Sequence, residues 1–266
     1  MAIERDALQF PSESSDLVRR IRARTPARLL AGRAGACYRT ETQLELREAH
    51  AAARDAVRTE LDVETCFGAD FVSRWKIFEA HTMAGTKDEY LLRPDLGRRF
   101  SGASRTEIAR LCPKGNNLQV VIGDGLSVTA VAAQVPRLLG LLFEGARLEG
   151  WTVGQPFAVR HCRVGILNEI GELLAPDVAV LLIGERPGLA TAESLSAYLA
   201  YKPRSPHTDA NRNLISNIHD RGVSPQNAAA RIVGLAKQMM QTKDSGCNLK
   251  EEFAALKSAS ERNQLS

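Results

Sequence analysis

The sequence predicts an α/β protein in which a parallel sheet follows a mainly helical N-terminal region. Two apolar runs, at residues 118–122 and 178–183, are rich in valine, isoleucine and leucine and end at glycine. Runs of this length and composition are typical of buried parallel strands. Helical patterns at residues 127–148 and 167–174 accompany them, and strands that alternate with helices indicate a Rossmann-like sheet.

The helical N-terminal region is expected over residues 1–112 and the Rossmann-like domain over residues 113–266. A loop-like Pro-Lys-Gly-Asn-Asn stretch marks the change of pattern between them. Three helix starts are predicted in the first part. They are a short basic helix from residue 14 to residue 24, capped by Ser14 or Ser15; a helix that opens on the capping-box spacing of Thr40 and Gln43; and a helix that begins at Arg93, Pro94 and Asp95.

The Rossmann-like domain holds further predicted elements. They are two strands, at residues 156–160 and 194–201, and a long helix opened by Ser224 as N-cap and Pro225 at the first helical position. Within the helix over residues 127–148, Pro136 is expected to kink or interrupt the chain, because proline lacks a backbone N–H donor.

Composition is that of an ordinary globular protein. Hydrophobic residues make up 44% of the 266, and no run approaches the roughly 18 to 20 apolar residues that span a bilayer. No secretory leader is visible, so we expect a cytoplasmic protein. Five cysteines and five histidines are widely scattered, which argues against a disulfide framework and against a metal bound by side chains of this chain.

The charge of the chain is uneven. Residues 1–39 hold eight arginines and four acidic residues, whereas the remainder is neutral. A basic arm can bind nucleic acid, a membrane surface or a partner protein. No helix-turn-helix, zinc finger or aromatic RNA-binding pattern is visible, and aromatic residues are only 5% of the chain. We therefore favour a partner protein; a merely solvated arginine-rich helix is the alternative.

The strongest candidate for a binding loop follows the apolar run at residues 178–183. Ligands of open α/β sheets bind just beyond the carboxyl ends of the strands, and Glu185 and Arg186 stand at that point, between two glycines. The alternative is a solvated Gly-Pro turn in which these two charges pair with each other.

Residues 123–125, Gly-Asp-Gly, resemble part of a dinucleotide-binding fingerprint. The third glycine is absent, because Val128 stands in its place. An anion could still lie at the start of the following helix, with Ser127 as its cap. The pattern is thus poor support for a nicotinamide or flavin cofactor.

His161 and Cys162 invite the idea of a catalytic pair. Neighbours on an extended chain face opposite ways, whereas such a pair needs facing side chains. We therefore expect a structural cysteine and a solvated histidine.

Several motifs together resemble one known family. Gly-Glu-Arg-Pro-Gly-Leu at residues 184–189, followed by Glu-Ser-Leu-Ser-Ala-Tyr at residues 193–198, is similar to the light (small) chain of ethanolamine ammonia-lyase. Further blocks fit in the same order, at residues 25–28, 32–35, 93–99, 124–127 and 215–219. The resemblance covers roughly residues 17–248, and it is specific because the blocks keep their register along the chain.

The resemblance implies the small subunit of an adenosylcobalamin-dependent enzyme that deaminates ethanolamine to acetaldehyde and ammonia by radical chemistry. In that family a heavy chain, a TIM-type barrel, holds the substrate and the catalytic residues. This chain would clamp the cobalamin against it, with no catalytic residue of its own, while the N-terminal region docks the heavy chain. The hetero-oligomer would lie in the cytoplasm. Enclosure in a bacterial microcompartment is an open alternative that the sequence does not indicate, because the chain lacks the long N-terminal extension that some family members carry.

The resemblance also carries cofactor contacts to Val164, Glu185 and Leu214. Glu185 could accept charge-assisted hydrogen bonds from the amide side chains that rim a corrin ring. Val164 would make backbone and apolar contacts. Leu214 stands where the family more often has cysteine, so any contact there is apolar or through the backbone.

His219 could be considered as a lower ligand of cobalt. The Asp-x-His-x-x-Gly motif of such proteins is absent, because Asn217 stands two residues before it, and family members keep the cofactor's own base on cobalt. We expect a structural or interface histidine. Two other functions stay open: a free-standing Rossmann-type enzyme with a nucleotide cofactor, and a scaffold subunit without cofactor contact, for which Leu214 is slight support.

Overall fold

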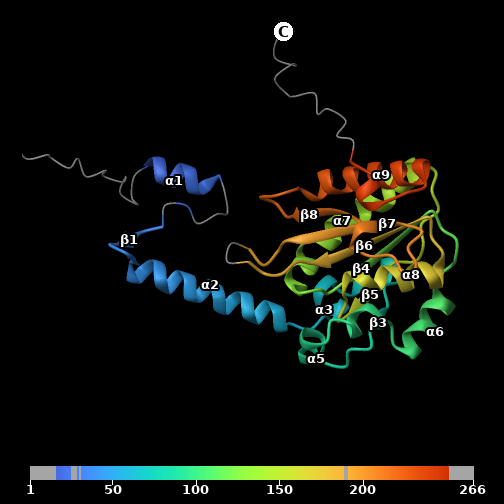
Figure 1. The fold of residues 1–266 in the computed structure, drawn as a ribbon, viewed down its shortest axis with the longest axis horizontal. Coiled ribbons are helices and arrows are strands. Elements are labelled where there is room, and N and C mark those ends of the chain that lie inside the picture. Colours follow the sequence, from blue (N-terminus) through green and yellow to red (C-terminus); the bar gives the residue numbers. More distant parts are fainter. Residues whose placement is uncertain (1–15, 25–28, 30, 189–190, 252–266) are drawn as a thin grey trace, which may run out of the picture.

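The structure, a computed structural model, describes residues 16–24, 29, 31–188 and 191–251. These residues form a layered α/β body and a helical arm that stands off it (Figure 1). We call the described residues up to 58 the arm and those from 59 onward the body. The body holds a six-stranded sheet in the order β3-β5-β4-β6-β7-β8. Its strands are β3 (Glu79–His81), β4 (Leu118–Gly123), β5 (Phe157–Arg160), β6 (Val178–Gly184), β7 (Leu195–Tyr201) and β8 (Asn213–Ile218). The arm holds a short antiparallel pair, β1 (Arg33–Ala34) and β2 (Cys37–Tyr38).

The sheet is parallel in one part and antiparallel in the other. β3, β5, β4 and β6 run parallel, with Ile122 of β4 beside Leu182 of β6. β7 is antiparallel to β6, and β8 to β7. The predicted α/β, Rossmann-like class is confirmed. The antiparallel extension was not predicted, and it arises because the connection over residues 185–194 is too short for the crossover that a parallel neighbour needs.

Helices cover both faces of the sheet. The α-helices are α1 (Asp16–Ala23), α2 (Thr40–Arg58), α3 (Val63–Phe67), α4 (Ala69–Trp75), α5 (Lys87–Leu92), α6 (Gly102–Leu111), α7 (Val128–Leu148), α8 (Leu167–Leu174) and α9 (Pro225–Thr242). Short 3₁₀ turns are η1 (Leu96–Arg98), η2 (Val164–Ile166), η3 (Asp209–Asn211) and η4 (Gly246–Asn248). The predicted caps of the two long body helices are confirmed, since Ser127 accepts from the Ala130 N–H and Ser224 from the Asn227 N–H.

Two local predictions are wrong, and a third, that Pro136 kinks or interrupts its helix, is wrong as to the interruption. α2 begins at Thr40, and its N-cap Arg39 makes no side-chain cap, so Thr40 does not start a capping box. Arg93 closes α5 through its N–H to Glu89 O, and only the single turn η1 follows. α7 continues through Pro136 without interruption. The proposed caps of the basic helix, Ser14 and Ser15, lie outside the described residues, whereas the helix itself is present as α1.

Successive side chains of the central strands point to opposite faces of the sheet, where they pack in two separate hydrophobic cores. On one face Val120 of β4 and Val180 of β6 pack in the core that includes α7 and α9. On the other face Val121 and Leu181 pack in the core that includes α6 and α8. This period of two on strands that are buried on both sides explains why their sequences are continuously apolar.

The arm contributes little to either core. Its helix α2 buries only Thr42 and Ala56 among its side chains, and α1 buries only Val18. β3, which precedes residue 113, nevertheless lies at the edge of the body's sheet beside β5. None of the described helices is long and apolar enough to cross a membrane.

Candidate functional site

The loops at the carboxyl ends of β4, β5 and β6 surround a pocket of about 350 Å³. Val164, Glu185 and Leu214, which lie far apart in the sequence, all line it. Val164 opens η2 after β5, Glu185 follows β6, and Leu214 lies on β8. The structure therefore brings the three sequence-predicted residues to one place. We call this cavity the edge pocket.

Glu185 is held rigidly at the pocket wall. Its Oε2 accepts from Ser194 Oγ at 2.7 Å, and its Oε1 accepts from Ser196 Oγ at 2.6 Å and from the Asn217 N–H at 2.9 Å. A carboxylate has about four acceptor positions, so one remains on Oε2. Arg186 is exposed and makes no ion pair with Glu185 among the described residues, so the alternative of a solvated, self-paired turn is wrong.

The other two predicted residues supply apolar surface. Val164 is half-buried, and the side chain of Leu214 is 47% exposed, which leaves its face open to a ligand. Leu214 pairs across the sheet with Tyr198 of β7, which also lines the pocket. Burial, helped by the negative charges of Asp209 and Glu185, raises the pKa of the Tyr198 hydroxyl, so that it stays neutral. The pocket thus combines an apolar wall with one fixed carboxylate.

The Gly-Asp-Gly turn after β4 is packed against β6 rather than open to a ligand. Gly125 has φ +56°, and a Cβ there would lie 2.3 Å from Gly184 O. The Leu126 N–H donates to the same oxygen at 3.1 Å. A dinucleotide fingerprint needs free backbone there for the pyrophosphate to approach. The occupied turn argues against a nucleotide cofactor bound in that way.

Asp124, in the middle of this turn, fixes the loop after β5 that lines the pocket. It is fully buried and accepts from the backbone N–H groups of His161 and Cys162 at 2.8 and 2.7 Å, and from Lys87 Nζ at 3.3 Å. It therefore holds the loop that carries Arg163 and Val164. The motif drew attention to this aspartate, but its contacts depend on the neighbouring strand and could not be predicted locally.

The prediction for Cys162 is confirmed and that for His161 is wrong. Cys162 is fully buried, and its pKa is raised by burial and by the charge of Asp124, so it is not a nucleophile. His161 is only 4% exposed. Its Nδ1 faces Ala84 O and its Nε2 faces Glu60 Oε2, each at 2.9 Å, and its ring stacks on Tyr90.

His219 is a structural histidine, as expected. It is 5% exposed, with Nε2 2.7 Å from Asn217 Oδ1 and Nδ1 accepting from the Arg221 N–H at 3.2 Å. Both ring nitrogens are therefore used within one turn. Across the described residues, no group of three or more His, Cys, Asp or Glu side chains is placed to hold a metal ion.

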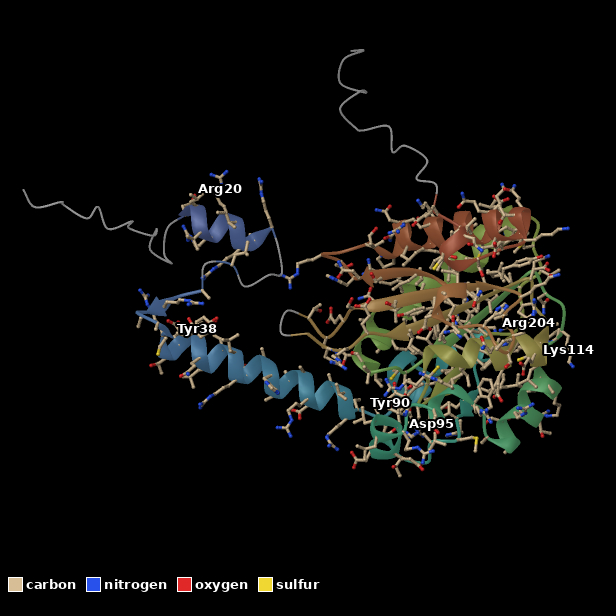
Figure 2. The ribbon with its side chains drawn as sticks, viewed as in Figure 1. Arg20, Tyr38, Tyr90, Asp95, Lys114 and Arg204 are labelled. Atoms are coloured by element: carbon tan, nitrogen blue, oxygen red, sulfur yellow. The ribbon has the colours of Figure 1, made fainter. Side chains whose placement is uncertain are left out.

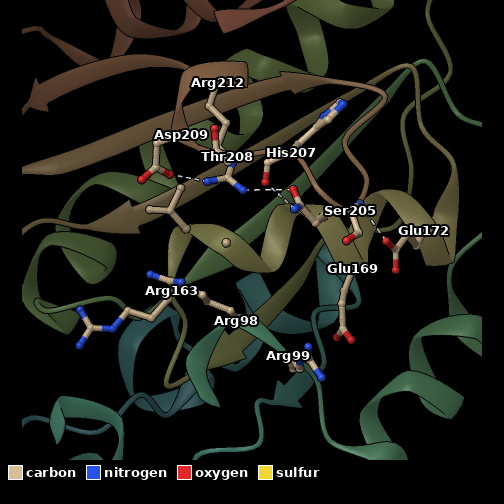
Figure 3. Close-up of a pocket in the computed structure, with 13 residues that line it drawn as sticks. Arg98, Arg99, Arg163, Glu169, Glu172, Ser205, His207, Thr208, Asp209 and Arg212 are labelled. Atoms are coloured by element: carbon tan, nitrogen blue, oxygen red, sulfur yellow. Dashed lines mark hydrogen bonds and ion pairs between the residues drawn. The ribbon is translucent and has the colours of Figure 1, made fainter. Parts of the chain in front are cut away.

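A larger cleft of about 650 Å³ adjoins the edge pocket and shares Arg163 and Val164 with it. Figure 3 shows its polar lining, in which Arg212 is held by an ion pair to Asp209. We call it the arginine cleft, because it is lined by Arg98, Arg99, Arg163 and Arg212. Sequence analysis did not identify it, because these residues come from three separate loops.

Comparison with known proteins gives a consistent match. Residues 15–250 match the family model described as ethanolamine ammonia-lyase light chain (EutC). The chain is 44% identical over 230 residues to the ethanolamine ammonia-lyase small subunit of Clostridium perfringens, which covers 86% of this chain and 76% of that protein. It is 43% identical, with the same coverage, to the small subunit of Clostridioides difficile. Against that of Listeria monocytogenes serotype 4a it is 42% identical over 226 residues, covering 85% and 75%.

Proposed function

Because the chain belongs to the ethanolamine ammonia-lyase light chain family, we propose that it is the small subunit of an adenosylcobalamin-dependent enzyme. That enzyme would convert ethanolamine to acetaldehyde and ammonia. In it, this chain clamps one edge of the cobalamin against a heavy chain that carries the substrate and the catalytic residues. The observation that carries the proposal is the convergence of Val164, Glu185 and Leu214 on the edge pocket.

The residues present fit the edge of a corrin ring. A corrin has an apolar plane and a rim of amide side chains, which need an apolar wall and hydrogen-bond acceptors. The wall is supplied by Val164 and Leu214, and the acceptor by the free position on Glu185 Oε2. Since Ser194 and Ser196 fix this carboxylate, it loses little side-chain entropy when it binds a donor.

The volume of the pocket supports a shared site. About 350 Å³ accommodates part of a corrinoid, so most of the cofactor would lie against the second subunit. When bound, adenosylcobalamin supplies the radical that starts the reaction. The residues of this chain would orient the ring and exclude water from one side of it.

The arm supports the proposal of a large partner surface. Its exposed apolar side chains include Leu17, Leu29, Tyr38 and Leu44, which a monomer would leave in water. An obligate interface of this kind buries on the order of 2,000 Å² or more. We infer that these side chains pack against the heavy chain, whose TIM-type barrel would complete the site.

Acetaldehyde release tests the proposal. This chain, co-purified with its own heavy chain, is assayed with ethanolamine and adenosylcobalamin, and each component is omitted in turn. Turnover that requires both chains and the cofactor is the expected result. A stable complex without turnover would indicate that the enzyme acts on another substrate or that this chain is a scaffold subunit. Failure to form a complex would favour a free-standing enzyme with a nucleotide cofactor.

A further inference from the structure

The arginine cleft carries more positive charge than its own carboxylates neutralise. Glu169 already accepts from the Phe100 N–H at 2.6 Å and from Arg105 at 2.7 Å. The other two carboxylates of the lining are also occupied: Glu172 accepts from the Ser205 N–H at 2.9 Å, and Asp209 is paired with Arg212. Within the described part of the chain, the side chains of Arg98 and Arg99 make no hydrogen bond or ion pair. The cleft is therefore lined by four guanidinium groups and three carboxylates, and two of those guanidinium groups have no partner among the described residues.

Arg163 is fixed at the junction of the two cavities. Its guanidinium lies 4.1 Å from the centre of the Tyr90 ring, and its Nη2 donates to Tyr90 O at 3.1 Å. Tyr90 is fully buried, so the stacked guanidinium cannot easily swing into solvent. The side chain is thus preorganised before any ligand arrives.

Arg98 lies over the start of the helix that follows. A Cβ on Gly165 would be 2.8 Å from Arg98 Cγ, so glycine at this position allows the arginine stem to cross the first turn of η2. Arg98 and Arg163 therefore both line the cleft, and each brings a positive charge to it (Figure 3).

Three buried nitrogen atoms around the cleft have no hydrogen-bond partner. They are Nε of Arg163, Nε of Arg212 and Nδ1 of His207. The side chain of Arg212 is only 5% exposed, so it is built into the wall rather than solvated. Buried polar atoms normally have hydrogen-bond partners. The guanidinium groups of Arg163 and Arg212 therefore keep donors that this chain does not use, and guanidinium groups pair with the oxygen atoms of anions.

We propose that the arginine cleft binds the phosphodiester of the cobalamin nucleotide loop, with Arg98 and Arg163 as its principal contacts. This inference rests on the proposed function. A cobalamin phosphate is tethered to the rim of the corrin, and the cleft opens beside the edge pocket through Arg163 and Val164. Guanidinium groups match phosphate oxygens in geometry and charge. A ring seated in the edge pocket would therefore have its phosphate within reach of these arginines.

The test compares corrinoids with and without phosphate. The assembled complex of both chains is titrated with cobinamide, cobinamide phosphate and cyanocobalamin, and binding is followed by visible absorbance. The variants are Arg98→Gln and Arg163→Gln, with Arg147→Gln, an exposed arginine at the far end of α7, as matched control. Because Arg98 is exposed, its variant keeps the test valid even if Arg163→Gln disturbs folding.

The expected result is selective. Cobinamide phosphate binds about 10- to 100-fold more tightly than cobinamide in the wild type, as charge-assisted hydrogen bonds imply. Arg98→Gln and Arg163→Gln each remove most of that preference. Arg98→Gln, whose side chain lies outside the edge pocket, leaves cobinamide affinity unchanged, and Arg147→Gln changes neither quantity.

Three outcomes would overturn the inference. Equal binding of the two cobinamides would show that the cleft ignores phosphate, while leaving the proposed function intact. A normal phosphate preference in Arg98→Gln, together with weaker binding of the heavy chain, would assign the cleft to acidic side chains of the partner. Failure of every corrinoid to bind the wild-type complex would overturn the proposed function as well.

Discussion

The arm and the body of this chain differ in how much of their apolar surface is buried. The body buries two continuous cores on the faces of one sheet, and β4 and β6 have no exposed residue. In the arm, α2 has only two buried side chains over its whole length, and it leaves Leu44 59% exposed. Figure 2 shows side chains around the arm helices that project away from the body. The body can therefore be stable by itself, whereas the arm needs another surface to cover it.

The chemistry of the two regions differs in the same way. The body contains polar groups that are both buried and paired, as in the network of Asp124, Lys87 and His161. In the arm, Arg19 and Asp16 form an ion pair in which both side chains are exposed to solvent. Exposed pairs of this kind contribute little to stability. The difference suggests that changes in the body act on folding and cofactor binding, and changes in the arm on assembly.

The largest effect is expected for Asp124→Ala in the body. The substitution leaves Lys87 as a buried, unpaired charge and removes the acceptor of two backbone N–H groups. We expect a loss of about 3–5 kcal/mol in the free energy of unfolding, measured by denaturant titration. Asp95→Ala, which breaks an exposed pair with Arg93, is the control and should change stability by less than about 0.5 kcal/mol. Similar values for both variants would contradict the structural role of Asp124.

Apolar side chains of the arm should have the next largest effect, and on assembly alone. Leu17→Glu and Leu44→Glu are each expected to weaken heavy-chain binding by about 2 kcal/mol or more, as anchors of an interface do. The melting temperature of the isolated chain should not change, because both leucines are exposed. Leu148→Glu, at a leucine at the end of α7 that is still more exposed, is the control. Unchanged binding in the arm variants would refute docking through this surface.

Glu185→Ala is expected to weaken cobalamin binding by the assembled complex about 10- to 100-fold, since it removes a charged acceptor. Assembly of the two chains should persist. Spectroscopic titration measures the first quantity and size-exclusion chromatography the second. Glu193→Ala, which changes an exposed carboxylate in the same loop, is the control. Lost assembly with unchanged cobalamin affinity would show that Glu185 belongs to the subunit interface instead.

The smallest effect concerns the junction of the two regions, where Glu60 accepts from Arg160 and His161. Burial raises the pKa of this carboxyl, but the hydrogen bonds from Arg160 and His161 and the positive charges of His161 and Lys87 outweigh it and lower the pKa below 4.5. A lowered folded pKa contributes stability above the unfolded pKa, and this is lost as the pH falls through the folded value. Because the side chain is 42% exposed, the contribution is below about 1 kcal/mol.

Glu60→Gln should therefore lower the free energy of unfolding slightly at pH 6. The difference from the wild type should shrink as the pH falls below about 4.5. Denaturant titrations at both pH values measure it. A difference that grows in acid would mean that the carboxyl is not stabilised by these partners.

Local pattern was enough to predict much of the body. The apolar runs of β4 and β6 and the caps Ser127 and Ser224 were all predicted, because burial on both faces and helix capping leave a signature within a few residues. The position of Glu185 just after β6 was predicted for the same reason. The family was identified from short motifs that keep their order along the chain.

Only the tertiary structure decided how these elements meet. Half of the residues of β8 are polar, and β3 has only three residues, so neither strand has a strong sequence signal of its own. Each forms because a neighbouring strand supplies its backbone hydrogen-bond partners. His161 is buried because Glu60, Ala84 and Tyr90 surround it. The convergence of Val164, Glu185 and Leu214, and of the arginines beside them, depends on strand order. The sequence determines local propensity. Contacts between residues that are distant in the chain determine the site, and these contacts form only when the body folds.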